Sequence, residues 1–125
     1  MDRLENINVL VVEDDIVGRM YMETLFKNRC KNLHFASNGI EAINMCENGS
    51  GINLILMDMK MPLMDGYEAT KKIKLFNEDV IIIAQTAFAL VGDEEKSLAA
   101  GCDDYVSKPI KKENLFKVIG KYYKC

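Results

Sequence analysis

Short apolar runs alternate along the chain with stretches of mixed polarity. The runs lie at residues 7–12, 33–36, 54–57, 80–84 and 105–107. The first, third and fourth runs are continuously apolar, which is typical of strands that are covered on both faces of a sheet. The run at 33–36 gives a weaker strand prediction. Together the runs predict five strands.

Apolar residues between these runs recur at helical spacing. One face of a first helix is expected to hold Val17, Met20, Leu25 and Phe26. A second helix is expected to carry Ile40, Ile43 and Cys46 on one face. Further helices are predicted over 67–75 and 90–100, the latter ending at Gly101. The clearest stripe comes last, with Leu115, Val118, Ile119 and Tyr122. Five strands alternating with five helices predict a doubly wound parallel α/β sheet with helices on both faces.

Reactive side chains follow four of the five runs. Glu13 and Asp14 follow the first, Asp58 the third, Thr86 the fourth and Lys108 the fifth. Each residue alone has an ordinary explanation, such as a helix cap or a turn residue. Ligands of an open parallel sheet bind beyond the carboxyl ends of its strands. We therefore expect these five side chains to meet in one site, whereas Asp15 is interpreted only as a helix cap.

The residue types in this set suit phosphoryl transfer. Carboxylates held close together repel one another, and oxygen ligands favour a hard cation such as Mg²⁺. With the charge neutralised, one carboxylate is free to attack phosphorus and form an aspartyl phosphate. Lys108 offers a point charge for the phosphoryl oxygens or for the attacking carboxylate, and the hydroxyl of Thr86 offers the phosphoryl group a hydrogen bond.

Composition limits the alternatives. A length of 125 residues suits one domain, 1–125, with a core from about 6 to 123. The net charge of -3 argues against direct nucleic-acid binding. No apolar run approaches the ~20 residues of a membrane span. The N-terminus does not resemble a signal peptide, and the four cysteines lack metal-type spacing, so we expect reduced thiols and a cytoplasmic location.

Four blocks of the sequence closely resemble the receiver domain of two-component response regulators. They are Val11-Val12-Glu13-Asp14, the segment from Met57 to Gly66, Gln85-Thr86-Ala87, and Tyr105-Val106-Ser107-Lys108-Pro109. The resemblance runs from Ile7 to Tyr122. It implies a flavodoxin-like fold with strand order 2-1-3-4-5.

The resemblance also implies roles for individual residues. Asp58 would be the phosphoacceptor, supplied by a phosphohistidine on a histidine kinase or a histidine phosphotransfer domain. Glu13, Asp14, Asp58 and the backbone carbonyl of Lys60 would hold Mg²⁺ or Mn²⁺. Thr86 and Lys108 would engage the phosphoryl group.

A conformational switch is part of the same expectation. Thr86 would move toward the phosphoryl group and the ring of Tyr105 would swing inward, repacking the surface of the fourth helix, fifth strand and fifth helix. Lys60 and Phe88 would flank the mouth of the site, and bulky Phe88 would slow hydrolysis. Such a domain catalyses its own phosphorylation and dephosphorylation but is not a conventional enzyme.

The sequences of two segments, Asp65 to Thr70 and Ala100 to Tyr105, resemble those of receivers attached to hybrid sensor histidine kinases. The chain would then be the cytosolic part of a larger, membrane-bound protein. Whether it is free-standing or excised, and whether it forms a transient homodimer, stays open, and no membrane contact by this domain itself is expected.

Three other functions fit the sequence less well. A haloacid-dehalogenase-like phosphatase needs a second acid two residues after its nucleophile, where this chain has Lys60. A flavodoxin-like FMN carrier would not place Glu13, Asp14 and Asp15 in its phosphate loop. A phosphorylation-independent interaction module would not need the acids, Thr86 and Lys108.

Overall fold

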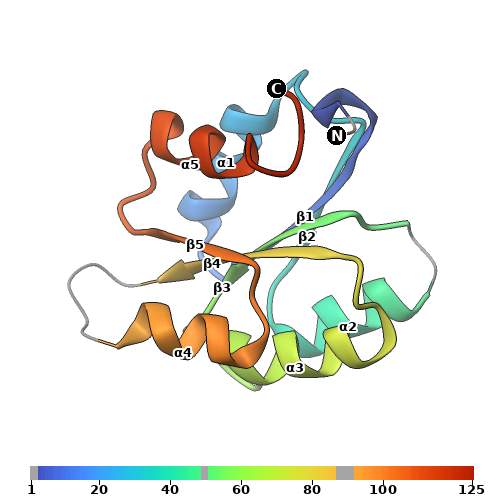
Figure 1. The fold of residues 1–125 in the computed structure, drawn as a ribbon, viewed down its shortest axis with the longest axis vertical. Coiled ribbons are helices and arrows are strands. Elements are labelled where there is room, and N and C mark those ends of the chain that lie inside the picture. The colour runs from blue at the N-terminus through green and yellow to red at the C-terminus, as the bar shows by residue number, and fades with distance from the viewer. Residues whose placement is uncertain (1–2, 49–50, 87–91) are drawn as a thin grey trace.

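A computed structural model of the chain describes residues 3–48, 51–86 and 92–125. Within these ranges five parallel strands form one sheet: β1 (Asn8–Val12), β2 (Asn32–Ala36), β3 (Leu54–Asp58), β4 (Ile81–Thr86) and β5 (Asp104–Ser107). Their order across the sheet is β2-β1-β3-β4-β5. The predicted α/β fold and strand order are confirmed (Figure 1).

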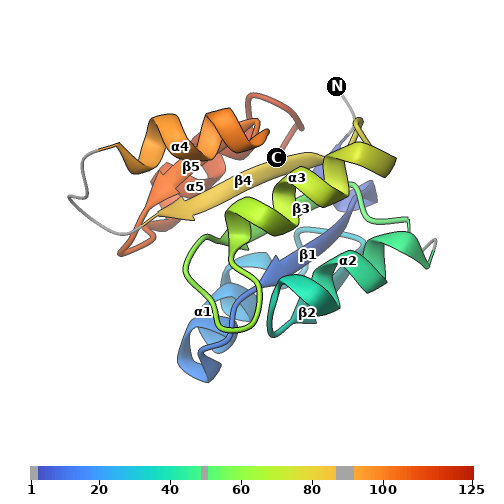
Figure 2. The same ribbon diagram turned by 90° about the horizontal axis from the view of Figure 1, so that it is seen from below.

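Helices cover both faces of the sheet. On one face lie α1 (Ile16–Phe26) and α5 (Lys112–Ile119), and on the other lie α2 (Gly39–Glu47), α3 (Gly66–Phe76) and α4 (Asp93–Ala100) (Figures 1 and 2). A short 3-10 helix, η1 (Leu4–Asn6), precedes β1. The helix predicted from residue 90 begins at Asp93 in the structure, and residues 87–91, including Phe88, lie outside the described ranges.

Strand β1 shows why the apolar runs are continuous. Val9 and Val11 pack against the layer that contains α1 and α5, whereas Leu10 and Val12 pack against the layer of α2 and α3. All four side chains are fully buried. A strand between two helical layers has no solvent-facing side, and therefore no polar alternation.

The expected face of the first helix is partly wrong. Helix α1 buries Met22, Leu25 and Phe26, whereas Val17 and Met20 are 70% and 63% exposed. Met22 and Leu25 lie three residues apart and share the face toward the sheet, so Val17 and Met20 fall on the other side of the helix. On α2, Ile40 is likewise exposed, whereas Ile43 and Cys46 pack against the core as expected.

The last stripe is confirmed apart from the helix end. Leu115 and Ile119 are fully buried and Val118 is partly buried. Helix α5 stops at Ile119, so Tyr122 lies beyond it, but its side chain still packs on the same cluster.

Side-chain caps mark where α1 and α3 begin. The Asp15 carboxylate accepts a hydrogen bond from the backbone N–H of Gly18 at 2.9 Å, which confirms its interpretation as the cap of α1. Asp65 caps α3 in the same way through the N–H of Glu68 at 3.0 Å.

Among the described residues, no helix is long and apolar enough to cross a membrane.

Candidate functional site

Strands β1 and β3 bring three carboxylates together at one edge of the sheet. Glu13 and Asp14 follow β1, and Asp58 is the last residue of β3. One oxygen from each lies within 4.8 Å of the others. Glu13 and Asp58 are buried, with 5% and 4% exposure, whereas Asp14 is exposed. The cluster is therefore anchored in the protein and reachable from solvent at Asp14.

Lys108 joins this cluster from the end of β5. Its Nζ lies 3.1 Å from Oδ2 of Asp58 and 3.4 Å from Oε2 of Glu13. Burial alone would lower the pKa of Lys108, but the charges of Asp58 and Glu13 outweigh it, so the pKa is raised. Lys108 therefore stays charged and balances part of the negative charge.

The acid cluster keeps an electrostatic cost despite this ion pair. Burial, followed by the charge of Asp58, raises the pKa of Glu13 above its ordinary 4.5, although Lys108 pulls it down. The backbone N–H of Asp15 donates to the Glu13 carboxylate at 3.2 Å. A charged Glu13 is thus less favourable here than in water, and a cation bound to the cluster would remove this penalty.

The ligand atoms suit a hard divalent cation. All three side chains offer carboxylate oxygens, and oxygen ligands favour Mg²⁺ or Mn²⁺. Two oxygens on one Mg²⁺ lie at most about 4.2 Å apart, at twice the usual Mg–O distance. An ion would therefore draw the three carboxylates slightly together or reach one of them through a water. The backbone N–H of Lys60 donates to Oδ1 of Asp58 at 3.0 Å, so the chain turns closely past the Asp58 carboxylate.

Close packing holds that turn in place. The N–H of Gly66 donates to the carbonyl of Met59 at 3.1 Å. A Cβ atom at Gly66 would lie 2.5 Å from the carbonyl oxygen of Asp58 and 2.8 Å from Cα of Met59. The Asp65-Gly66 pair therefore brings the start of α3 against the backbone of Asp58.

Thr86 and Tyr105 lie on the side of the site toward α4. Thr86 is buried, and its hydroxyl donates to the carbonyl of Val106 at 3.4 Å. Its own carbonyl accepts the N–H of Lys108 at 2.8 Å. Tyr105 is half-buried beside Ala84, and the charge of Glu94, followed by burial and a hydrogen bond to Glu94, raises the pKa of Tyr105. In this structure the Thr86 hydroxyl is directed to β5 and Tyr105 to α4.

Two residues near the site were not identified from the sequence. Arg19 donates from Nε to the carbonyl of Glu13 at 2.8 Å, contacts Oγ of Ser37 and lies over the Phe35 ring at 5.9 Å. Arg19 thus links α1 and β2 to the backbone of Glu13. No sequence spacing predicts this role for Arg19. Gln85 pairs in register with Asp58 and is 2% exposed. Its position as a polar residue at the end of an apolar run is the signal that could have identified it.

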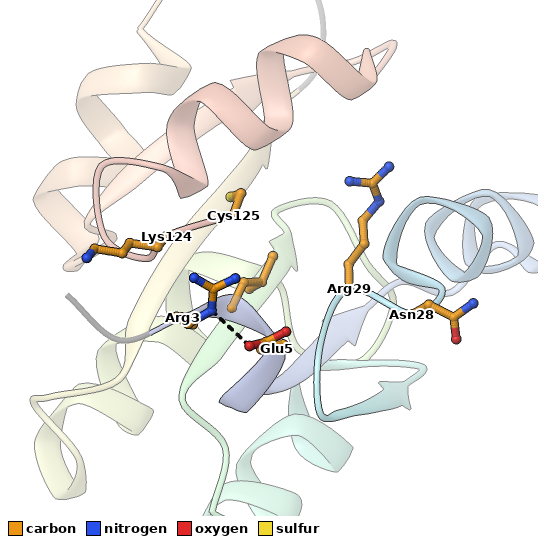
Figure 3. A pocket seen from close by; sticks show the side chains of 7 residues that line it. Arg3, Glu5, Asn28, Arg29, Lys124 and Cys125 are labelled. Atoms are coloured by element: carbon orange, nitrogen blue, oxygen red, sulfur yellow. Dashed lines mark hydrogen bonds and ion pairs between the residues drawn. The ribbon is translucent and has the colours of Figure 1, made fainter.

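A separate cavity of about 210 Å³ lies near the termini, at the other end of the sheet (Figure 3). Arg3 and Glu5 form an exposed ion pair of 2.8 Å on its wall. Arg29, Lys124 and Cys125 also line it. It contains none of the residues predicted for the site.

Comparisons with known proteins agree with this geometry. The profile of the response regulator receiver domain matches residues 9–120. The response regulator mcs4 of Schizosaccharomyces pombe is 34% identical over 132 residues, covering 83% of this chain and 25% of the relative. The chain thus spans about a quarter of the length of that relative, and less of several others.

Two solved structures are similar over nearly the whole chain. The receiver domain of Ssk1 from Saccharomyces cerevisiae, crystallised with the histidine phosphotransfer protein Ypd1, has a TM-score of 0.87 and 34% identity, covering 95% of this chain and 90% of that one. The receiver domain of a Pseudomonas aeruginosa sensor histidine kinase, with magnesium in its active site cleft, has a TM-score of 0.82 and 34% identity, covering 94% and 97%. The sheet order, the profile match and these relatives together establish that the chain belongs to the response regulator receiver domain family of two-component phosphorelays.

Proposed function

We propose that Asp58 is the phosphoacceptor of this receiver domain. The observation that carries the proposal is the double ion pair of Lys108 with Asp58 and Glu13, at 3.1 and 3.4 Å, inside the cluster of three carboxylates. Glu13, Asp14, Asp58 and the backbone carbonyl of Lys60 would hold Mg²⁺ or Mn²⁺. When bound, the ion neutralises the negative charge of both the cluster and the phosphoryl donor.

The reaction exchanges one bond to phosphorus for another. A carboxylate oxygen of Asp58 attacks phosphorus of a phosphohistidine, and the P–O bond forms as the P–N bond breaks. The imidazole nitrogen keeps the electron pair of the broken bond and takes up a proton. Lys108 holds the attacking carboxylate and then contacts the phosphoryl oxygens. Hydrolysis of the aspartyl phosphate later returns Asp58 to its carboxylate form.

The donor is a histidine kinase or a histidine phosphotransfer protein, as supported by the complex known for the related Ssk1 receiver. Helix α1 begins next to the site and exposes large apolar side chains there, among them Ile16, Val17 and Met20. An exposed apolar group beside a reactive centre suits a protein partner. Direct nucleic-acid binding is not part of the proposal, because the net charge is -3, and the proposed location is the cytosol.

Phosphorylation would be read out at the surface of α4, β5 and α5. The Thr86 hydroxyl would leave the carbonyl of Val106 and donate to the phosphoryl group. Tyr105 would then leave Glu94 and turn inward into the space behind Thr86. The switch shifts an equilibrium between two conformations. The free energy of that shift equals the difference between the two conformations in their interaction free energy with the phosphoryl group.

A direct experiment separates this function from that of a phosphatase and from that of a phosphorylation-independent module. The protein is incubated with acetyl phosphate and Mg²⁺, and its intact mass is measured over time. A receiver gains one phosphoryl group and then slowly loses it by hydrolysis. No labelling is expected in EDTA or in the variant Asp58→Asn. A phosphatase would instead turn over phosphate esters, and a phosphorylation-independent module would stay unlabelled. Labelling that persists in Asp58→Asn would contradict the assignment.

A further inference from the structure

A second cavity, of about 410 Å³, lies between α1 and the loop that joins β5 to α5. Its walls are largely apolar: Val17, Tyr21 and Met22 come from α1, and Pro109 and Ile110 come from the loop. The Tyr21 hydroxyl donates to the carbonyl of Ile110 at 2.6 Å, which ties the two walls together. The volume falls within the range of about 300–1,000 Å³ that is usual for small-molecule sites.

Gln85 contributes an unsatisfied polar group to this cavity. It lines the cavity from β4, on the same face of the strand as Ile83, and is 2% exposed. Its Nε2 is buried and has no hydrogen-bond partner among the described residues. A buried amide donor without an acceptor destabilises the folded state, and most such groups are satisfied by protein, water or ligand.

Charge decides which ligand the cavity would accept. Glu13 and Asp15 also line the cavity, and the ammonium of Lys108 is already shared between Glu13 and Asp58. An anion would meet carboxylates there without a free positive charge. A small cation would be drawn to the carboxylates rather than to the apolar walls. The remaining class is neutral.

We propose that this cavity binds a small neutral molecule with an apolar body and a carbonyl-type acceptor for Gln85. Primary amides belong to this class, because their carbonyl oxygen is the acceptor that Nε2 of Gln85 lacks. Asp14 and Asp58 do not line the cavity, so the ligand does not occupy the acid cluster. Glu13 and Lys108 border both, so the two sites share a wall.

The test is an NMR titration of the isotope-labelled full chain with benzamide, benzoate and toluene as probes. Benzamide is expected to bind saturably, shifting the side-chain amide signals of Gln85 and the backbone signals of Val17 and Ile110. Benzoate is expected to bind at least about fivefold more weakly, because its charge meets Glu13 and Asp15. Benzamide is expected to bind Gln85→Leu at least about fivefold more weakly, because the hydrogen bond to Gln85 is lost. Toluene binding should not weaken in Gln85→Leu. Asn44→Leu, an exposed amide on α2, serves as the matched control and should leave benzamide affinity unchanged.

Several results would overturn the proposal. Benzamide shifts that do not saturate, or that lie away from α1 and the Ile110 loop, would mean that the cavity holds only water. Equal benzamide affinity in wild type and Gln85→Leu would remove Gln85 from recognition. If Gln85→Leu fails to fold, the Gln85 side-chain amide signals of the wild type decide the question, because their lack of response to benzamide contradicts the contact.

Discussion

The ammonium of Lys108 lies 3.1 Å from the carboxylate of Asp58, although β5, which Lys108 follows, and β3, which ends at Asp58, are separated by β4. The long side chain reaches over the end of β4 and also meets Glu13 at 3.4 Å. These ion pairs balance part of the negative charge of the site. Their loss would leave three carboxylates facing one another.

Replacing Lys108 with alanine should therefore destabilise the metal-free protein. The side chain of Lys108 is 38% exposed, so solvent screening reduces the loss, which we expect to be about 1 kcal/mol. Mg²⁺ should restore most of this stability, because the ion takes over the charge balance. The measurement is urea unfolding with and without Mg²⁺.

Lys121→Ala provides the control for Lys108. Lys121 pairs with Asp104 at 3.2 Å, but its side chain is 59% exposed and lies away from the acid cluster. The unfolding free energy of Lys121→Ala should be close to that of wild type, and the small difference should not depend on Mg²⁺. Equal, Mg²⁺-independent losses in the two variants would contradict the role given to Lys108.

Glu13→Gln should stabilise the metal-free protein at neutral pH. The pKa of Glu13 is raised in the folded state, mainly by burial and then by Asp58, so folding favours its protonated form. That contribution is complete below the unfolded pKa, near 4.5, and is lost as the pH rises through the higher folded value. The stability advantage of Glu13→Gln should therefore grow as the pH rises above 4.5 and then level off.

Thermal unfolding across pH, in EDTA and in Mg²⁺, measures this effect. Magnesium should stabilise wild type more than Glu13→Gln, because the variant lacks one charged ligand. The account of Glu13 is wrong if Glu13→Gln is the less stable protein in EDTA at neutral pH, or if it gains as much from Mg²⁺ as wild type.

Leu63→Asn should stabilise the protein by about 0.5–1 kcal/mol. Leu63 has a left-handed backbone with φ of 69° and a side chain that is 81% exposed, so it carries strain and loses little burial. Asparagine tolerates this conformation better than leucine does. Leu75→Asn is the matched control, since Leu75 is 87% exposed within α3. There the same change should be neutral or slightly destabilising, and urea unfolding compares the two.

The proposed switch can be followed at Tyr105. A fluorine label on its ring should report a new environment when the protein is phosphorylated, because the ring leaves Glu94. Thr86→Ala removes the hydroxyl that would contact the phosphoryl group. This variant should still accept phosphate on Asp58 but show a smaller change in the fluorine spectrum. If phosphorylation changes the fluorine spectrum of Thr86→Ala as much as that of wild type, the movement of Tyr105 does not depend on Thr86.

The sequence predicts the centre of this fold better than its outer faces. Strands β1, β3 and β4 lie between two helical layers, so their continuous apolar runs have one interpretation. Helix α1 has apolar residues on several faces, and its spacing alone does not distinguish Met22, which is buried, from Met20, which is exposed. The difference is set by how the helix lies on the sheet.

The same contrast holds for the site. Side chains at strand ends were predictable because parallel strands deliver their carboxyl ends to one edge. Arg19 was not predicted because it acts from the first turn of α1, through a hydrogen bond to the backbone of Glu13. Gln85 escaped because its place beside Asp58 depends on the register of β3 and β4.

The most direct test of the central claim is to locate the phosphoryl group on the chain. The protein is phosphorylated with phosphoramidate and Mg²⁺, reduced with borohydride, digested and sequenced by tandem mass spectrometry. Borohydride converts an aspartyl phosphate into homoserine, and we predict homoserine at position 58 alone. Homoserine at Asp14 or at another acid, or unmodified Asp58 in protein that has gained a phosphoryl group, would contradict the account.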